Sequence, residues 1–473
     1  MTKRIYITTA IPYVNASPHI GFALEIVQAD CLARFYRAQG WDVFFSTGAD
    51  ENSLKNVQAA EAAGVKVQKW VDQYAAEYEK LRDALNLTYD VFNRTSENHH
   101  FKGAQKLWSL CKKEDLYKKM YRGLYCVGCE LFYKENELDN GRCPEHDTVL
   151  EKVEEENYFF RLSSYEDYLY KLISTDKLKI TPQTRKNEVL SFIKQGLEDF
   201  SISRSNARAR GWGVPVPNDD SQVMYVWFDA LVTYLTALGF ASSEKLFDEY
   251  WKNNPNRLHV IGKGIIRFHS VYWPAMLAST GINLPTAEFV HGYITVEGQK
   301  ISKSLGNTID PFELVDKFGV EAVRYYLLRE IPAWGDGDFS ISRFKEIYNG
   351  ELANGLGNLV ARVARLAADT NLSLPPKKNF KFKKEVGENL KQYRFDHALI
   401  ALWEEISALD KKINDEKPWE LEGRTLKRVI TPISSEVREI AFNLSPFLPK
   451  TSEKILEQFT GKVSAEKPLF PRI

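Results

Sequence analysis

Two short elements, far apart in the chain, could both contact a phosphate. The first is His19-Ile20-Gly21, in which a histidine side chain and a glycine without a side chain come at the expected start of a helix. The second is Lys300-Ile301-Ser302-Lys303-Ser304, which lies between Gly298 and Gly306. Lysine ammonium groups are compact positive charges that stabilise the negative charge developing during attack on phosphorus. Either element alone is typical of an ordinary loop or helix end, but the pair predicts a nucleoside triphosphate site.

A third group of residues has the spacing of a metal site. Cys126 and Cys129 are separated by two residues, as are Cys143 and His146, and thirteen residues separate the two pairs. Two short turns that each present two soft ligands form a tetrahedral zinc site, and four filled positions leave none for an activated water. The spacing therefore predicts one structural Zn²⁺ ion.

The composition favours a soluble, cytoplasmic, multidomain protein. A chain of 473 residues with 44% apolar residues corresponds to about three domains with real cores. The 63 basic and 63 acidic residues balance, which excludes a globally basic nucleic-acid binder but leaves a local basic face possible. We find no apolar run of about 18 residues that could cross a membrane, and Pro12 and Pro18 interrupt any signal-peptide core. The odd number of cysteines argues against a disulfide framework, and Cys31 and Cys111 are expected in the core.

The elements that must position these residues alternate between strand and helix at the N-terminus. Residues Arg4 to Thr8 are expected to form a buried strand, and a helix is expected to start near Pro18. Residues Asp42 to Ser46 are expected to form the next strand. This order predicts a right-handed parallel crossover and an α/β, Rossmann-type nucleotide fold. Ligands bind beyond the carboxyl ends of such strands, where His19 and Asp50 are expected.

The rest of the chain predicts an insertion, a return of the α/β pattern and a helical C-terminal part. The predicted parts are the first half of the Rossmann catalytic domain at residues 1–115, a connective insertion with the zinc knuckle at 116–215, the second half of the catalytic domain at 216–295, a linking region with the lysine–serine loop at 296–349, and an all-α domain at 350–473. The α/β pattern resumes at Met224 to Phe228 and at Leu258 to Gly262. Amphipathic helices are expected at Phe395 to Ile413 and Thr425 to Leu444.

The two phosphate-binding elements resemble the signatures of class I aminoacyl-tRNA synthetases, and further segments resemble methionyl-tRNA synthetases in particular. These segments cover essentially the whole chain in the expected order: Ile11 to Asn15, Tyr225 to Ala230, Ile261 to Lys263, Phe268 to Ser270 and Trp273 to Met276. The resemblance implies a ligase that activates L-methionine with ATP and Mg²⁺ and transfers the methionyl group to the 3′ end of tRNA(Met). It also implies a Rossmann-type catalytic domain with a zinc-bearing insertion, followed by an all-α anticodon-binding bundle.

The same resemblance assigns roles to individual residues. It implies ATP binding by His19, Gly21, Lys263, Ile294, Lys300, Ser302, Lys303 and Ser304, with His19, Lys300 and Lys303 as catalytic groups. It implies methionine binding by Ile11, Tyr13, Asp50, Trp227, Ala230, Tyr234, Ile265, Phe268, His269 and Trp273. An aromatic, apolar pocket suits a side chain that has no charge and only a weak sulfur acceptor, while Asp50 would hold the substrate ammonium. Arg204 matches a family position close to the reaction.

The helical C-terminal part is expected to read the anticodon of the tRNA. Asn358 and Arg362 are four residues apart on one helical face, so that both could reach the same base. Trp419 lies at a helix boundary and could stack on an unpaired base. By resemblance, all three residues match anticodon-reading positions. Because no appended tRNA-binding domain follows the helical bundle before Ile473, a monomer is predicted.

The chain departs from the family pattern at four positions, which keep two alternatives open. Phe22 replaces the second histidine of His-x-Gly-His, Asn52 and Ser53 replace the last two residues of Asp-Glu-His-Gly, and Gly264 replaces the aspartate of Gly-Lys-Asp. One alternative is a catalytically weakened paralogue that binds tRNA. The other is a class I synthetase for another apolar amino acid. The insertion of about 100 residues is too short for the editing domain of isoleucine, valine and leucine enzymes.

Overall fold

The computed structural model describes residues 3–145, 147–301, 306–376 and 379–473, apart from the side chain of Leu131, and these residues form two compact units. Unit 1 consists of Met1–Pro18, Asp42–Arg82 and Tyr89–Val290. Unit 2 consists of His19–Trp41, Asp83–Thr88 and His291–Ile473. The division of the chain into five parts stays a prediction.

A parallel sheet forms the centre of unit 1, and in the described residues it has six strands in the order β3-β2-β1-β12-β13-β7. These strands are β1 (Arg4–Thr9), β2 (Asp42–Ala49), β3 (Val91–Arg94), β7 (Lys179–Thr181), β12 (Arg257–Gly262) and β13 (Ala287–His291). Strand β1 pairs in parallel with β2 and with β12, and both of its faces are buried, as its apolar sequence requires. The predicted α/β class with a Rossmann-type parallel sheet is confirmed.

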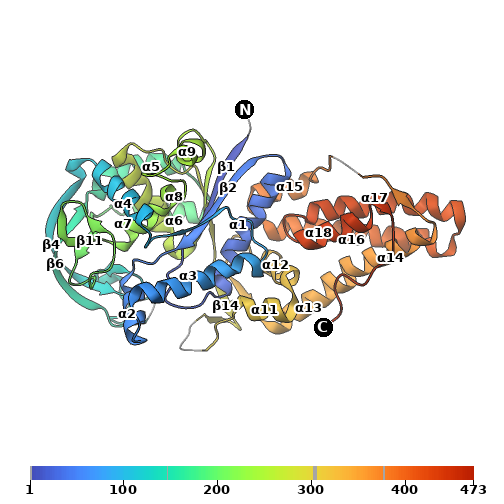
Figure 1. The fold of residues 1–473 in the computed structure, drawn as a ribbon, viewed down its shortest axis with the longest axis horizontal. Coiled ribbons are helices and arrows are strands. Elements are labelled where there is room, and N and C mark those ends of the chain that lie inside the picture. The colour runs from blue at the N-terminus through green and yellow to red at the C-terminus, as the bar shows by residue number, and fades with distance from the viewer. Residues whose placement is uncertain (1–2, 146, 302–305, 377–378) are drawn as a thin grey trace. The chain divides into compact units, whose positions relative to one another are not determined.

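The insertion within unit 1 consists largely of antiparallel strands. The two long strands β4 (Leu116–Cys126) and β6 (Glu151–Phe160) form a curved ribbon (Figure 1) and are joined by β5 (Leu131–Tyr133) and β8 (Phe200–Ser201). A second small sheet contains β9 (Ser203–Ser205), β10 (Pro215–Val216) and β11 (Asp219–Met224). The end of β4 brings the first predicted metal ligand, Cys126, into a tight turn.

Helices pack around the sheet of unit 1. They are α2 (Leu54–Ala62), α3 (Val67–Ala84), α4 (Asn98–Leu110), α5 (Glu166–Ser174), α6 (Gln183–Lys194), α7 (Val226–Leu231), α8 (Thr233–Thr236), α9 (Lys245–Phe247) and α10 (Trp273–Thr280). The segment from Met224 to Phe228 is divided between a strand and a helix, because β11 ends at Met224 and α7 begins at Val226. The apolar core between these layers contains Tyr6, Phe228 and Trp273.

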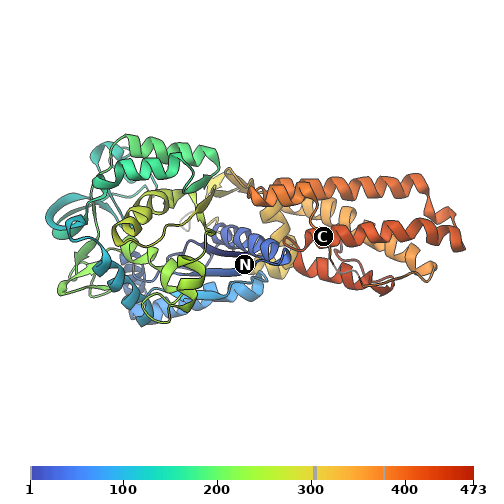
Figure 2. The ribbon, with the colours of Figure 1, turned by 90° about the horizontal axis from the view of Figure 1, so that it is seen from above.

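Unit 2 is mainly helical. Its helices are α1 (Ile20–Ala38), α11 (Pro311–Phe318), α12 (Val320–Arg329), α13 (Ile341–Ile347), α14 (Asn358–Asp369), α15 (Lys384–Lys391), α16 (Phe395–Glu416), α17 (Gly423–Leu444) and α18 (Pro449–Gln458). Helix α17 packs against α14, α16 and α18 to form a bundle (Figures 1 and 2), and the two helices expected there lie within α16 and α17. Short strands complete the unit: β14 (Ile294–Val296), β15 (Gln299–Lys300) and β16 (Gly337–Phe339), and the pair β17 (Ser373–Leu374) and β18 (Gly461–Lys462).

A buried ion pair joins three segments of unit 2. Asp30 of α1 and Arg324 of α12 are fully buried, and their carboxylate and guanidinium groups are 2.8 Å apart. Arg324 also donates to the carbonyl oxygen of Phe447, between α17 and α18, at 3.0 Å. Thr88 and Arg34 donate further hydrogen bonds to Asp30. Although burial opposes ionisation, the Arg324 and Arg34 guanidinium groups hold the pKa of Asp30 below its usual value.

Among the described residues, no helix combines the length and the apolar character that crossing a membrane would require.

Candidate functional site

A buried carboxylate occupies the carboxyl end of β2 in unit 1. Asp50 is 2% exposed, and its backbone N–H donates to the carbonyl oxygen of Pro12 at 2.9 Å. Its Oδ1 has no hydrogen-bond partner among the described residues. Burial raises the pKa of Asp50 well above its usual value, and the nearby carboxylates of Asp229 and Glu130 raise it further. Such a group favours binding of a cation, which would supply the missing partner.

Aromatic rings lie beside Asp50. Tyr13 forms an isolated β-bridge with Asp50, and its ring meets Trp227 edge-on with centroids 6.4 Å apart. Trp227 in turn stacks on Phe268 with centroids 3.7 Å apart and a 5° angle between the planes. The hydroxyl of Tyr13 and the indole N–H of Trp227 are buried without a hydrogen-bond partner in the described part of the chain. Apolar ring faces with few polar groups suit an uncharged side chain.

His269 continues this group of rings as a neutral residue. Burial lowers the pKa of His269 to about 4, so the ring carries no charge at neutral pH. Its Nδ1 lies 3.0 Å from the carbonyl oxygen of Ile265 and its Nε2 lies 2.6 Å from the hydroxyl of Tyr234. Because a carbonyl oxygen only accepts, Nδ1 carries the proton and the tyrosine donates to Nε2. Tyr234 also lies 6.1 Å, centroid to centroid, from Trp273.

The remaining residues predicted for methionine binding also belong to unit 1. Ala230 is buried on α7, and Ile265 packs against the core of unit 1. Ile11 packs beside Gly48, where an added Cβ would lie 2.1 Å from the backbone oxygen of Asn93. Glycine is therefore required at position 48 to let β2 and β3 approach each other.

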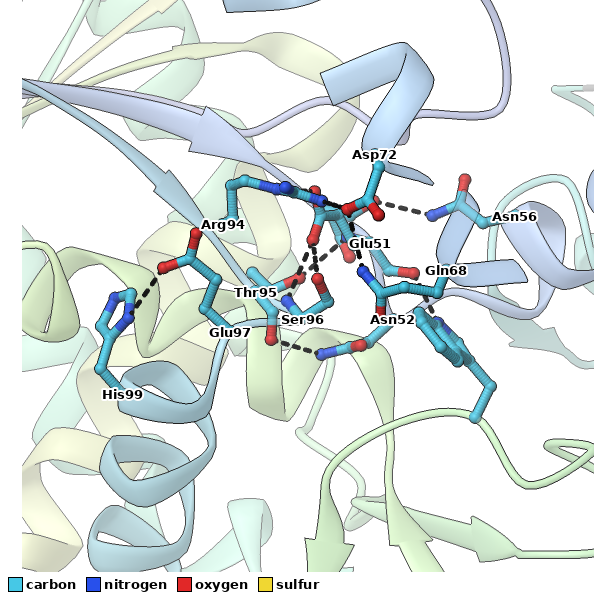
Figure 3. A network of polar contacts seen from close by, with 12 residues as sticks. Glu51, Asn52, Asn56, Gln68, Asp72, Arg94, Thr95, Ser96, Glu97 and His99 are labelled. Atoms are coloured by element: carbon cyan, nitrogen blue, oxygen red, sulfur yellow. Dashed lines mark hydrogen bonds and ion pairs between the residues drawn. The ribbon is translucent and has the colours of Figure 1, made fainter. Parts of the chain in front are cut away.

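A polar network fixes the turn that follows Asp50 (Figure 3). Arg94, at the end of β3, donates to Glu51 at 2.6 Å, and the backbone N–H of Ser96 donates to the other carboxylate oxygen at 3.1 Å. The backbone N–H of Glu51 itself donates to the hydroxyl of Thr95 at 2.8 Å. The loop after β3 thus holds Glu51 from both its main chain and its side chain, which fixes the position of the adjacent Asp50.

Three cysteines predicted as metal ligands meet in the insertion. The Sγ atoms of Cys126, Cys129 and Cys143 all lie within 4.8 Å of one another, with 3.4 Å between those of Cys129 and Cys143. In a tetrahedral zinc site the sulfurs would be about 3.8 Å apart, so this donor set fits a soft metal ion. The predicted fourth ligand, His146, lies outside the described residues.

The predicted phosphate-binding elements lie in unit 2. Helix α1 begins at Ile20, two residues after the expected start near Pro18. His19 is its N-cap residue, and its Nδ1 accepts the N–H of Gly21 at 3.0 Å. The proton of the neutral ring is therefore on Nε2, which can donate to a phosphate oxygen. A Cβ at Gly21 would lie 2.8 Å from the His19 ring, so a larger residue there would require the ring to move from its capping position.

The base of the lysine–serine loop lies against the start of α1. The N–H of Ile20 donates to the carbonyl oxygen of Ile309 at 3.0 Å, and Asn307 donates to that of Lys300, also at 3.0 Å. Lys300 is exposed on β15, and Ile294 begins β14. Ser302, Lys303 and Ser304 lie outside the described residues. Lys263 belongs to unit 1, directly after β12.

The residues predicted to read an anticodon lie in the helical bundle of unit 2. Trp419 is 50% exposed and, with Arg362, lines a groove of about 570 Å³. Arg362 donates to Asp410 at 2.5 Å and to Asn414 at 3.0 Å, so α16 fixes the guanidinium group. Asn358 is exposed at the start of α14, one helical turn before Arg362, and does not line the groove.

Comparisons with known proteins identify the family. The family model for class I tRNA synthetases (M) matches residues 5–152 and 138–364. The methionine–tRNA ligase of Thermotoga maritima is 42% identical over 98% of this chain and 76% of its own length. That of Brucella suis is 39% identical over 96% of this chain and 91% of its own length. The chain belongs to the methionyl-tRNA synthetase family.

Solved structures of this family have the same fold. The methionyl-tRNA synthetase of Mycobacterium tuberculosis, in complex with methionyl-adenylate, superposes with a TM-score of 0.91 at 37% identity, covering all of both chains. The apo form of the same enzyme gives a TM-score of 0.84 at 34% identity over 100% of this chain and 99% of that one.

The positions that depart from the methionyl-tRNA synthetase pattern have local structural roles here. Asn52 donates to the carbonyl oxygen of Thr95 at 2.9 Å and to the carboxylate of Asp229 at 2.8 Å. Ser53 caps the N-terminus of α2 by accepting the N–H of Asn56 at 3.2 Å. Phe22 is buried in the first turn of α1, and Gly264 is exposed after β12.

Several buried polar residues near Asp50 were not predicted from the sequence. Glu130 is fully buried against Arg204 and Tyr125, and His100 lies 2.6 Å from the carboxylate of Asp229. One signal in the sequence points to Glu130, since it directly follows the metal ligand Cys129. No local pattern identifies His100 as a partner of Asp229, because 129 residues separate them.

Proposed function

We propose that this chain is a methionine–tRNA ligase, which activates L-methionine with ATP to methionyl-adenylate and then transfers the methionyl group to the 3′ end of tRNA(Met). One observation carries the proposal: Asp50, buried with an unpaired carboxylate oxygen, lies beside the ring group of Tyr13 and Trp227. A free amino acid with an apolar side chain offers both matching groups, an ammonium for the carboxylate and an uncharged chain for the rings.

The thioether of methionine fits this pocket by its chemistry. It has no charge and only a weak sulfur acceptor, and it packs favourably against aromatic rings. The direct stack of Trp227 on Phe268 leaves no space between the two rings, so we expect them to separate when the side chain enters. The pocket residues of this proposal are Ile11, Tyr13, Asp50, Trp227, Ala230, Tyr234, Ile265, Phe268, His269 and Trp273.

The reaction needs no nucleophile from the protein. A carboxylate oxygen of methionine attacks the α-phosphorus of ATP, and the bond to the bridging oxygen breaks to release pyrophosphate. A ribose hydroxyl at the 3′ end of the tRNA then attacks the carbonyl carbon, and AMP leaves. The protein supplies positive and hydrogen-bonding groups for the charge that builds on the phosphates.

The groups proposed for ATP come from the two phosphate-binding elements and their neighbours. Nε2 of His19 and the ammonium groups of Lys300 and Lys303 are proposed to stabilise the developing charge. The full proposed set is His19, Gly21, Lys263, Ile294, Lys300, Ser302, Lys303 and Ser304, with Mg²⁺ bound to the ATP. The N–H groups at the start of α1 add partial positive charge that favours phosphate.

The metal and the tRNA complete the proposal. One structural Zn²⁺ ion would be held by Cys126, Cys129, Cys143 and His146 and would stabilise the insertion. Asn358, Arg362 and Trp419 are proposed to contact the anticodon. We further propose a cytoplasmic monomer, for which sedimentation should give a mass near 54.3 kDa, and twice that mass would contradict it.

The test is amino-acid-dependent exchange of pyrophosphate into ATP, measured with each of the twenty amino acids. Methionine alone should support exchange well above background. Exchange with isoleucine, valine, leucine or cysteine in its place would favour the second alternative. No exchange with any amino acid, in the presence of zinc and magnesium, would contradict an active ligase. In that case a large gain by Phe22→His would favour the weakened paralogue.

A further inference from the structure

We infer that Glu130 is a positioning residue for methionine binding: it holds the segment from Asp50 to Lys55 against the cysteine turn, and thereby links the metal site of the insertion to the amino-acid pocket. This inference rests on the proposed function, because the pocket it acts on is the one proposed for methionine. Glu130 does not itself contact the substrate in this scheme. It acts through the turn that carries Asp50.

Glu130 adopts a conformation and an environment that glutamate rarely adopts. Its φ angle is +52°, in the left-handed region that costs free energy for a residue with a side chain. Its side chain is fully buried, which is unusual for a glutamate unless other groups pair with it. It directly follows Cys129, so the turn that brings the cysteines together also directs this carboxylate inward. The surrounding contacts must compensate for both costs.

One carboxylate oxygen of Glu130 holds the start of α2. Its Oε1 accepts the backbone N–H of Lys55 at 3.1 Å. Lys55 is the second residue of α2, and the turn from Asp50 to Ser53 directly precedes this helix. In return, the ammonium of Lys55 donates to the carbonyl oxygen of Gly128 at 3.5 Å and lies 5.7 Å from the ring centroid of Tyr13. The cysteine turn and the pocket turn are therefore joined by two contacts.

The other carboxylate oxygen of Glu130 is held from the opposite side. The hydroxyl of Tyr125, on β4, donates to Oε2, and Nη2 of Arg204, on β9, lies 3.2 Å from it. The hydroxyl of Tyr225, just before α7, donates to the backbone oxygen of Glu130. The guanidinium of Arg204 lies over both tyrosine rings, 4.5 Å and 4.8 Å from their centroids. Glu130 thus joins β4, β9, α2 and the start of α7 at one buried point.

The location of Glu130 explains how it would affect methionine binding. Tyr225 directly precedes the helix that carries Trp227 and Ala230, and Lys55 follows the turn that carries Asp50. Metal binding fixes the cysteine turn, and Glu130 passes that constraint to both sides of the pocket. Loss of the carboxylate should therefore weaken methionine binding, with ATP contacts on other elements little changed.

The main test replaces Glu130 by glutamine and measures binding of labelled methionine by equilibrium dialysis. Glu130→Gln keeps the side-chain size and removes the charge that the guanidinium of Arg204 and the backbone N–H of Lys55 contact. We expect the Kd for methionine to rise about 10-fold or more. The KM for ATP in pyrophosphate exchange should stay within about twofold, and the metal content by mass spectrometry should be unchanged. The matched control is Glu135→Gln, an exposed glutamate of the same insertion, which should bind methionine as the unchanged protein does.

A structural role alone would give a different result. Glu130→Gln would then lower the melting temperature while the Kd for methionine stayed within about twofold of the unchanged protein, and this outcome would overturn the inference. If the unchanged protein itself bound no methionine, the proposed function would fail instead. The two failures are therefore distinguishable.

A second variant covers the case in which Glu130→Gln does not fold. Tyr125→Phe removes a single hydroxyl that donates to Glu130, and it should raise the Kd for methionine about threefold. Tyr117→Phe, on the same strand, removes a hydroxyl that donates to Asp199 and serves as its control. Equal Kd values for the two variants would count against the inference.

The link to the metal is tested by a cycle of four measurements. Methionine binding is compared for the unchanged protein and Glu130→Gln, each with and without chelation of the metal. We expect chelation to weaken binding in the unchanged protein and to have a clearly smaller effect in Glu130→Gln, because the link is already broken. Equal effects of chelation on both proteins would show that the metal acts by another route.

Discussion

Two buried aspartates, one in each unit, have opposite environments. Asp30 in unit 2 is fully buried and is paired with Arg324 at 2.8 Å, and its pKa is held below the usual value. Asp50 in unit 1 is equally buried, yet one of its oxygens has no partner among the described residues and its pKa is raised well above the usual value. The protein thus pairs one carboxylate internally and leaves the other for a charge from outside.

The difference predicts that Asp30 supports the fold, and it supports the proposal that Asp50 binds the ligand. Removing one partner of a buried pair leaves the other charge uncompensated, which is strongly destabilising. A buried carboxylate with no cationic partner and one unpaired oxygen among the described residues already bears part of that cost in the folded protein, and a bound ammonium would relieve it. The stability of the chain should therefore depend on Asp30, and ligand affinity on Asp50.

The largest effect is expected for Asp30→Asn. It should lower the free energy of unfolding by about 3–5 kcal/mol, because Arg324 would be left buried without its carboxylate. In pyrophosphate exchange, the KM for methionine should change little. Calorimetric unfolding measures the loss, with Asp316→Asn, an exposed aspartate of α11, as the control. If Asp30→Asn melted at the same temperature as the control, Asp30 would not support the fold, and the contrast between Asp30 and Asp50 would be wrong.

The pH dependence of Asp30 has a definite sign. Because its pKa is lower in the folded chain than in the unfolded one, its contribution is fully present above the ordinary value of 3.8 and is lost as the pH falls through the lowered pKa. The Asp30→Asn variant should lose this acid-dependent part of its stability.

Asp50→Asn should act on binding instead. We expect the affinity for methionine to fall about 10²- to 10³-fold, since the ammonium would enter a buried site without a counter-charge. The melting temperature should stay the same or rise, because a buried carboxylate with one unpaired oxygen has been removed. Equilibrium dialysis and calorimetry measure the two effects, with Asp167→Asn as an exposed control in unit 1. If Asp50→Asn lowered the melting temperature and left the affinity for methionine unchanged, Asp50 would support the fold and not ligand binding.

Glu288 offers a second buried carboxyl group with one unpaired oxygen, and the hydroxyl of Ser270 donates to its other oxygen. It is fully buried in β13, its Oε1 has no partner among the described residues, and burial raises its pKa from 4.5 to about 8. Its contribution to stability is therefore present below pH 4.5 and is lost as the pH rises toward 8. Between pH 5 and 8 the unchanged protein should lose about 2–4 kcal/mol more than Glu288→Gln.

Urea unfolding followed by tryptophan fluorescence at both pH values measures this difference. Glu114→Gln, an exposed glutamate of unit 1, should follow the unchanged protein. If the free energy of unfolding changed equally with pH in the unchanged protein and in Glu288→Gln, burial would not hold the proton on Glu288.

The smallest effect is expected where the group is exposed. Trp419 is 50% exposed, so the contribution to tRNA binding that we propose for it would come from stacking on a base and not from a buried charge. Trp419→Ala should raise the KM for tRNA about 10- to 100-fold, equivalent to about 1–3 kcal/mol, and leave methionine-dependent exchange unchanged. Aminoacylation kinetics measure it, with Ile400→Ala on α16 as the control. An unchanged KM for tRNA would place the anticodon contact elsewhere.

Local sequence patterns predicted the elements because those patterns are periodic. The apolar run from Arg4 to Thr8 matches β1, and the amphipathic run from Phe395 matches α16. The spacing of Cys126, Cys129 and Cys143 predicted a cluster that the structure confirms. The end of β11 at Met224 was not predicted, since an apolar run of a few residues fits a strand and a buried helix equally well.

Partners that are distant in the chain could not be predicted in this way. Strand β1 pairs with β12, about 250 residues later, and Arg204 reaches Glu130 from a separate strand. Asn52 looked like a loss of a family histidine, whereas the structure shows it bonded to Asp229. These contacts depend on the path of the whole chain.

The sequence by itself determined which chemical groups the chain carries and which elements present them, because residue type and period are local properties. Only the tertiary structure decided which buried charges find a partner. Asp30 and Asp50 are the same residue, yet the distance to a guanidinium and the exclusion of water set their pKa values in opposite directions. That difference separates a carboxylate that is paired within the fold from one that we propose binds the substrate ammonium.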